Sequence, residues 1–177
     1  MSDTKSRGNF DIIGDVHGYA DKLVGLLETM GYREQGGAFR HPTRTAVFIG
    51  DLIDRNARHG ATDQMDVVRI ARSMVESDSA LIVMGNHEFN AISWATPHPD
   101  KPGDYLRTRE GEKGAGHRHQ HARFLDEVGE GSTTHDEIVD WFRTIPLWID
   151  LGTVRFVHAC WHAESMARIG NLVSTWE

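Results

Sequence analysis

The sequence predicts a layered α/β domain with a largely parallel central sheet. Short β-branched or aliphatic runs, each stopped by Gly, alternate along the chain with segments of helical periodicity. That alternation is typical of strand–helix–strand units, in which a crossover helix joins neighbouring parallel strands. A chain of 177 residues, 39% of them hydrophobic, is long enough for one such domain with its own core. We therefore expect a single domain over 1–177, with an N-terminal tail at 1–9.

Five short segments have the composition of strands. The first three cover 10–14, 45–50 and 80–85, and each ends at a Gly. Continuous apolar runs of this length are typical of strands that are buried on both faces. A further pair is predicted at 148–151 and 153–158, separated by one glycine.

Three segments have the apolar spacing of amphipathic helices. The i, i+3, i+4, i+7 spacing runs from Leu23 to Met30, where Gly31 is a plausible C-cap, and it recurs from Val67 to Met74. The third helix is predicted to begin with a capping box over 134–137 (THDE). Its apolar stripe consists of Ile138, Trp141, Phe142 and Ile145.

The segment 97–120 departs from this pattern. It holds three Pro, four Gly and many charges, so we expect a long loop or insertion there. Its arginines, Arg107, Arg109 and Arg118, could extend a phosphate-binding surface or be plain solvated charge. The histidines of the tract GHRHQH at 116–121 are predicted to be solvated residues of a loop or helix start rather than a substrate-contacting or adventitious metal-binding tract. They are His117, His119 and His121.

Composition limits the partners of the protein. The net charge of −7 argues against bulk nucleic-acid binding and against an anionic membrane surface, because both are polyanions. A single cysteine, Cys160, excludes an internal disulfide framework and suits a reducing compartment. The polar first residues lack the apolar core of a signal peptide, and no run approaches the ~20 apolar residues of a membrane span. We therefore expect a cytoplasmic protein.

Side chains that bind metals follow four of the predicted strands. The segments are GDVHG at 14–18, GDLIDR at 50–55, GNHE at 85–88 and VHACWH at 157–162. Ligand sites of such sheets gather where the carboxyl ends of the strands meet the following loops. Carboxylate, amide and imidazole donors together suit Mn, Fe or Zn, and one carboxylate can bridge two ions ~3.5–4 Å apart. The candidate ligands are Asp15, His17, Asp51, Asn86 and His158. The alternative is that these are solvated turn residues, which does not account for four such strand ends in series.

These four segments, in this order, resemble the signature of the calcineurin-like metallophosphoesterases. The resemblance is to the branch that contains phosphoprotein phosphatases and bacterial diadenosine tetraphosphatases, and it runs from about residue 10 to residue 162. It implies a layered metallophosphoesterase sandwich, in which central sheets are flanked by helices. It also implies a binuclear centre of two divalent or trivalent ions, with Mn favoured and Fe, Zn, Co and Mg as alternatives. One ion is then held by Asp15, His17 and Asp51, and the other by Asp51, Asn86 and His158.

The resemblance further implies hydrolysis of a phosphoester by a hydroxide that two metal ions activate. His87 is then the general acid beside the leaving oxygen, Asp54 orients it, and Arg55 is a phosphate clamp. The alternative for His87 and Asp54 is a hydrogen-bonded pair without a catalytic role, and for Arg55 a surface ion pair. The implied substrate is a phosphomonoester, a phosphoprotein or a dinucleoside polyphosphate.

The sequence departs from the family pattern at its end. Relatives continue to a late His, whereas this chain has no His after His162, so we expect a truncated product or a fragment of the family fold. The second ion would then need His162, water or another chain as a ligand. Equally, His162 could make only local hydrogen bonds at the rim of the site and bind no ion. An uncovered sheet edge would favour a homo-oligomer. DRN at 54–56 and HAC at 158–160 replace the DRG and HGG of protein phosphatases, which weakens the expectation of phosphoprotein substrates.

Two rival functions remain open at this stage. One is a metal-binding module with weak or no catalysis, because the second ion could fail to bind without the missing ligand. The other is a nucleic-acid binder that uses the Arg and His tract at 107–123, which the acidic net charge disfavours.

Overall fold

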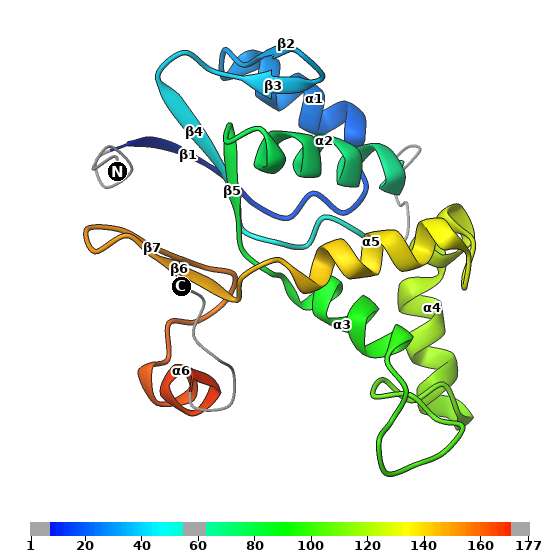
Figure 1. The fold of residues 1–177 in the computed structure, drawn as a ribbon. Coiled ribbons are helices and arrows are strands. Elements are labelled where there is room, and N and C mark those ends of the chain that lie inside the picture. The colour runs from blue at the N-terminus through cyan, green and yellow to red at the C-terminus, as the bar shows by residue number, and fades with distance from the viewer. Residues whose placement is uncertain (1–7, 55–62, 171–177) are drawn as a thin grey trace.

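The centre of the fold is a three-stranded parallel sheet in the order β1-β4-β5 (Figure 1). The computed structural model describes residues 8–54 and 63–170. The strands are β1 (Asn9–Ile13), β4 (Arg44–Phe48) and β5 (Ala80–Ile82). Ile13 pairs with Phe48, and Phe48 pairs with Ile82, so the three carboxyl ends lie at one edge. The predicted α/β class with parallel strands is therefore confirmed.

Two helices, α1 (Ala20–Thr29) and α2 (Gln64–Glu76), cover one face of this sheet (Figure 1). Their apolar stripes pack on the sheet. Leu23, Leu27 and Met74 are almost fully buried in the main core. The chain turns after α1 through Gly31, whose φ of 93° favours a residue without a side chain. A short hairpin of β2 (Arg33–Gln35) and β3 (Ala38–Arg40) follows.

The other face is covered by an antiparallel hairpin of β6 (Trp148–Asp150) and β7 (Arg155–Val157). Phe156 from this hairpin joins Val47 and Val83 in a second buried cluster, separate from the main core. The parallel sheet thus lies between a helical layer and a β layer. A last helix, α6 (Ala163–Gly170), follows the hairpin.

Three further helices extend from the carboxyl edge of the sheet. They are α3 (Asn86–Ala95), α4 (Gly111–Val128) and α5 (Thr133–Arg143). The predicted stripe of α5 is buried, as expected, but the predicted capping box at 134–137 is wrong. The N-cap is Ser132, whose hydroxyl accepts a hydrogen bond from the backbone N–H of His135. The hydroxyl that caps the helix therefore lies two residues before Thr134, and the helix begins earlier than predicted.

The long loop predicted at 97–120 is corrected in its second half, because α4 begins at Gly111. Only the stretch before it is irregular, and it is held to α3 by the hydrogen bond from the Arg107 N–H to the Ser93 carbonyl. Gly114 is needed for packing rather than for a turn. A Cβ there would lie 2.1 Å from the Arg109 carbonyl carbon.

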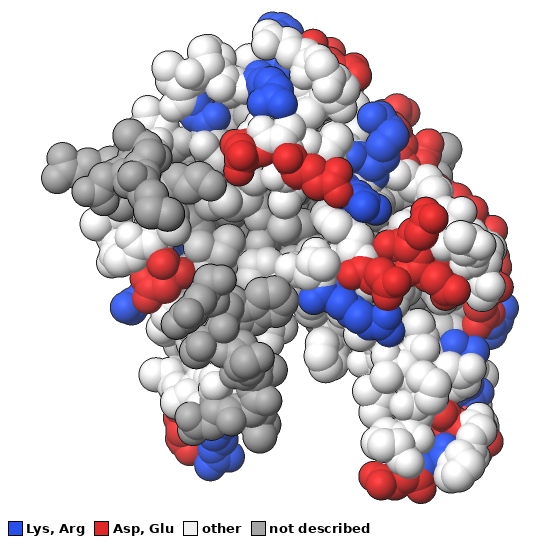
Figure 2. All heavy atoms as spheres, viewed as in Figure 1, with Lys and Arg blue, Asp and Glu red and all other residues white. Residues whose placement is uncertain are grey.

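The described surface shows mixed charge. On the face drawn in Figure 2, described Lys and Arg side chains are scattered among Asp and Glu and form no continuous basic surface. This arrangement gives no support to the nucleic-acid alternative on that face. Within 8–54 and 63–170, every helix is too short or too polar to traverse a lipid bilayer.

Candidate metal centre

The turns after β1 and β4 are tied together by their backbones. The N–H groups of Val16 and His17 both donate to the Asp51 carbonyl, at 2.9 and 3.0 Å, and the Gly18 N–H donates to the Leu52 carbonyl. Because these turns follow parallel neighbours, their side chains emerge at the same edge of the sheet.

Backbone strain is concentrated in these turns. Four described residues other than glycine have positive φ, and three of them are His17 (50°), Asp51 (53°) and Asp54 (67°). The left-handed region costs an L-residue of order 1 kcal/mol or more, and such outliers gather at functional sites. The fold therefore holds the three side chains in directions that relaxed turns would not give them.

Two glycines let the turns after β4 and β5 approach each other. A Cβ on Gly50 would lie 2.3 Å from the Gly85 nitrogen, and a Cβ on Gly85 would lie 2.3 Å from the Asp51 nitrogen. Only residues without side chains fit this contact, which brings the start of α3 against Asp51.

All five candidate ligands meet at this edge. Nε2 of His17 lies 3.8 Å from Asp15 Oδ2, and Nε2 of His158 lies 3.6 Å from Asp51 Oδ1. The same His158 nitrogen lies 3.2 Å from Asn86 Oδ1. Figure 1 shows that these residues come from segments far apart along the chain, since β1, β4, α3 and β7 reach this region separately.

The two imidazoles are oriented by backbone carbonyls. His17 Nδ1 lies 3.0 Å from the Ile53 carbonyl oxygen, and His158 Nδ1 lies 2.6 Å from the Ile49 carbonyl oxygen. A carbonyl can only accept, so each Nδ1 donates its hydrogen, and in the neutral ring Nε2 is the nitrogen left to bind a metal. This is the tautomer that a metal ligand needs.

Two groups of donors have the spacing of metal sites. The ligand atoms of His17, Asp51 and His87 lie within 4.8 Å of one another, as do those of Asp15, Asp51 and His158. Asp51 belongs to both groups and is 5% exposed. Asn86 adds a neutral oxygen beside the second group. The donor set of carboxylates, imidazoles and one amide fits ions of the Mn, Fe and Zn type.

Asp54 lies behind His87 and contacts two histidines. Its Oδ2 lies 3.0 Å from Nδ1 of His87, and Nδ1 of His121 lies 2.9 and 2.8 Å from its two oxygens. The backbone N–H of Asp54 donates to the side chain of Gln64 at 2.7 Å. His121 is 2% exposed, so the expectation of a solvated histidine is wrong at this position.

The pair of histidines sets the charge of Asp54. Burial acts to raise the pKa of Asp54, but the hydrogen bonds from His121 and from His87 hold it below its ordinary value. For His87, burial acts to lower the pKa, but the hydrogen bond to Asp54 and the charge of Asp51 raise it above its ordinary value. Asp54 is therefore an anion, and His87 keeps its proton to higher pH than a solvated imidazole.

Glu88 is a site residue for which sequence reasoning assigned no role. It is fully buried and accepts three backbone hydrogen bonds, from Asp51 and Gly85 to Oε2 and from Leu52 to Oε1. Burial raises the pKa of Glu88, and these N–H groups oppose that rise. Its carboxyl group thus ties the turn after β4 to the start of α3.

Two predicted participants are not placed in the centre. Arg55 lies outside the described residues. His162 makes local contacts, because its Nδ1 lies 2.7 Å from the Ser165 hydroxyl and 3.3 Å from the Ser165 nitrogen, at the start of α6. The structure therefore supports the local reading of His162 over its reading as a substitute ligand.

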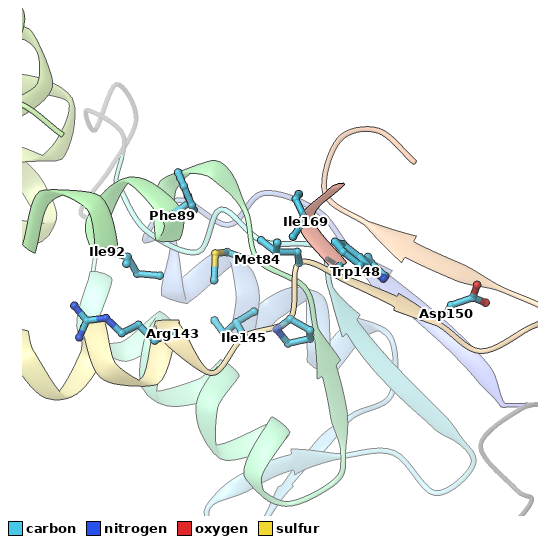
Figure 3. A pocket seen from close by; sticks show the side chains of 11 residues that line it. Met84, Phe89, Ile92, Arg143, Ile145, Trp148, Asp150 and Ile169 are labelled. Carbon is cyan, nitrogen blue, oxygen red and sulfur yellow. The ribbon is translucent and has the colours of Figure 1, made fainter. Parts of the chain in front are cut away.

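A pocket of about 500 Å³ lies between α3, the end of α5, β6 and α6 (Figure 3). Figure 3 shows Phe89 and Ile92 projecting from α3, with Trp148 and Ile169 coming from β6 and α6. Met84, two residues before Asn86, also lines it. Its lining is mostly apolar, and only Arg143 and Asp150 add charge.

Curated relatives of this chain are bacterial tetraphosphatases. It is 42% identical over 79 residues to a bis(5'-nucleosyl)-tetraphosphatase PrpE of Halalkalibacterium halodurans, covering 44% of this chain and 30% of the relative. Its identity to the Bacillus subtilis enzyme of the same name is 26% over 164 residues, covering 90% of this chain and 60% of the relative. A symmetrical bis(5'-nucleosyl)-tetraphosphatase of Salmonella arizonae is 32% identical over 96 residues, covering 54% of this chain and 29% of the relative. The chain thus spans 29% to 60% of these relatives' lengths.

Solved structures share the fold. A putative diadenosine tetraphosphatase superposes with a TM-score of 0.51 at 20% identity, covering 92% of this chain and 54% of the other. A protein serine/threonine phosphatase from Saccharomyces cerevisiae gives a TM-score of 0.50 at 15% identity, covering 82% of this chain and 36% of the other. The predicted layered sandwich is therefore confirmed. The family model described as calcineurin-like phosphoesterase matches residues 8–172, and on that coverage the chain belongs to this family.

Proposed function

We propose that this chain hydrolyses phosphoesters with two metal ions that share Asp51. The observation that carries the proposal is the meeting of two donor groups at that one buried carboxylate. We would assign Asp15 and His17 to one ion and Asn86 and His158 to the other, whereas the spacing of the donors alone groups Asp15 with His158 and His17 with His87. Bound ions would neutralise an anionic phosphoester and supply a hydroxide near neutral pH.

Side chains of the protein itself would protonate the leaving oxygen and bind the phosphate. Nδ1–H of His87 donates to Asp54, and Nε2 of His87 faces the centre at 3.9 Å from Asp51 Oδ2. Because His87 keeps its proton to higher pH than a free imidazole, it would donate that proton to the departing oxygen. Asp54 would hold the ring in position. Arg55, next to Asp54 in sequence, would bind the phosphate as a planar fork.

A dinucleoside polyphosphate is the substrate class that we favour. The support is the printed activity of the relatives from Halalkalibacterium halodurans and Bacillus subtilis, bis(5'-nucleosyl)-tetraphosphatase. Mn is the favoured ion, with Fe, Zn, Co and Mg as alternatives, because these ions accept overlapping donors. A cytoplasmic location and a homo-oligomer remain predictions. For the latter, Ile12 on β1 is 51% exposed and offers an apolar contact.

A metal-binding module with weak catalysis is the second candidate. It is favoured by the position of His162, which contacts Ser165 and leaves the group around His158 without a further imidazole among the described residues. In that case one ion would bind firmly, and turnover would be low.

Metal content and turnover, measured on the same sample, separate the two. We would load the protein with Mn, count bound ions by mass spectrometry, and assay a phosphomonoester, a phosphodiester, a phosphopeptide and diadenosine tetraphosphate. Two ions and turnover that Asp51→Asn abolishes are expected, with Asp66→Asn as the matched control, because Asp66 lies on α2 and pairs with Arg69. Equal turnover in the wild type and Asp51→Asn would overturn the assignment. One ion without turnover would establish the module instead.

The role of His87 has its own readout. His87→Ala should slow alkyl phosphates more than p-nitrophenyl phosphate, because a poor leaving group needs the proton most. An equal loss on both esters would remove the general-acid role.

A further inference from the structure

A second pocket, of about 390 Å³, lies between the end of α3, the loop before α4 and the start of α4. Its charged lining is mainly basic, although the whole chain carries a net charge of −7. The one carboxylate in the lining, Asp104, accepts hydrogen bonds from its own loop, including the Tyr105 N–H and the Thr108 hydroxyl. The basic residues are Lys101, Arg107 and Lys113, with His98 and His117 beside them.

Arg107 is held in this pocket without a counter-charge. Its guanidinium donates to two neutral amide oxygens, Asn90 Oδ1 at 2.5 Å and Gln120 Oε1 at 2.8 Å. Across 8–54 and 63–170, no carboxylate pairs with Arg107, and its buried Nε–H has no acceptor. Burial lowers the pKa of Arg107, whereas the charge of Asp54 acts to raise it. A partly desolvated cation without an anion is costly unless a ligand supplies the charge.

Neighbouring arginines are satisfied internally. Arg109 and Arg118 both pair with Glu130, at 3.3 and 2.5 Å, and the Arg109 guanidinium also covers the Tyr105 ring at 3.5 Å. These two residues therefore hold α4 to its surroundings. Of the three arginines in the segment 97–120, Arg107 alone has a charge that the described part of the chain leaves unpaired.

Both hydrogen-bond partners of Arg107 lie on helices that also carry residues of the centre. Asn90 follows His87 by three residues on α3 and so shares its face of the helix. Gln120 directly precedes His121, which contacts Asp54. The charge of Asp54 also acts on Arg107, so the pocket lies near the centre, toward the face of α3 that carries His87.

Resting on the proposed function, we propose that this pocket binds a further phosphate of a polyphosphate ester, with Arg107 as its main anchor. Arg107 would bind the phosphate next to the one that reacts, and Lys101 and Lys113 at the rim would bind the continuing chain. The pocket would thus select substrates whose leaving group is itself a phosphate chain over simple monoesters.

The test measures how tightly the protein binds phosphate ligands, which does not depend on whether it hydrolyses them. We would titrate the Mn-loaded protein with orthophosphate and with the non-hydrolysable β,γ-methylene analogue of ATP, by calorimetry. Arg107→Gln should weaken binding of the analogue by about tenfold and change that of orthophosphate by less than about threefold. Arg107→Lys should recover part of the loss. Arg72→Gln, which removes an exposed guanidinium paired with Glu76 on α2, should change neither.

Two results would overturn the inference: unchanged analogue binding in Arg107→Gln, or an equal loss for both ligands. If Arg107→Gln melts far below the wild type, Lys113→Gln replaces it, because Lys113 is exposed. Binding of the analogue to Lys113→Gln should be weaker by about threefold, with binding of orthophosphate less affected. A protein that binds the analogue through Arg107 but hydrolyses none of the esters would refute the proposed function and leave the pocket standing.

Discussion

Nδ1 of His121 lies within 2.9 Å of both carboxylate oxygens of Asp54, although 67 positions separate the two residues. A carboxylate can only accept, so His121 donates from Nδ1, whereas its buried Nε2 has no hydrogen-bond partner among the described residues. One carboxylate thus binds two imidazole N–H groups. Its Oδ2 cannot turn away from His87 without losing the hydrogen bond from His121.

His121 should therefore act as a positioning residue for Asp54. His121→Phe fills the space but removes the donor, and we expect kcat to fall by about tenfold with KM and metal content unchanged. His121→Asn can place an amide N–H near the lost Nδ1–H and should recover part of that loss. If His121→Asn and His121→Phe have equal kcat while both remain folded, the hydrogen bond has no positioning role.

Glu88 should contribute to stability through its three backbone donors. In Glu88→Gln an amide NH₂ replaces one accepting oxygen and faces a backbone N–H, so we expect a loss of about 2–3 kcal/mol in the free energy of unfolding. The measurement is urea denaturation of the metal-free protein. Glu127→Gln is the matched control, because Glu127 is exposed and accepts a single backbone N–H from Met65. It should cost less than about 1 kcal/mol, and an equal cost for both would contradict the prediction.

Gly85 should not tolerate a methyl group. In Gly85→Ala the new Cβ would lie 2.3 Å from the Asp51 nitrogen and 2.4 Å from Asp51 Oδ1. We expect more than about 3 kcal/mol of destabilisation and loss of Mn binding, because the turn that carries Asp51 must move. Gly14→Ala, where nothing lies within 4 Å, should cost less than about 1 kcal/mol. The measurement is the melting temperature of each variant with and without Mn. A Gly85→Ala protein that is stable and binds Mn would show that the close contact between Gly85 and Asp51 is not required.

Glu130 should make stability depend on pH. Burial acts to raise the pKa of Glu130, but Arg118 and the Trp94 indole N–H, at 2.5 and 2.9 Å, hold it below the ordinary value of 4.5. Since the folded pKa is depressed, the stabilisation is present above pH 4.5 and is lost as pH falls through the folded pKa. Glu130→Gln should melt about 2–4 °C below the wild type at pH 7, and this gap should close in acid. A gap that persists in acid would point to packing instead.

The strand ends were predictable because their chemistry is local. A Gly after an apolar run, followed by Asp or His, indicates both where a strand stops and what its turn presents, and parallel order brings such turns together. Asp15, Asp51 and Asn86 could thus be assigned to one edge before any coordinates, and the structure brings them together. Their roles as metal ligands stay predictions.

His121 could not be assigned in this way, because its partner is set by tertiary packing. A signal was nevertheless present: His121, Phe124, Leu125 and Val128 follow the spacing of a buried helical face, and all four are buried. The glycines at 111–116 concealed it, since helix propensity disfavours Gly even where close packing requires it. Glu88 gave no such signal, because its three partners are backbone N–H groups. Almost every residue type has this group, so the sequence does not show which positions bind Glu88.

The parallel order of β1, β4 and β5 also couples folding to the ion. The donors at Asp15, Asp51 and Asn86 follow three different strands, and His158 follows a fourth, so no single hairpin or helix carries a complete coordination sphere. An ion would bind only once all of these segments are assembled, and its binding free energy would then add to the stability of the whole domain. Chelation should accordingly lower the melting temperature as one cooperative transition, without first releasing one segment.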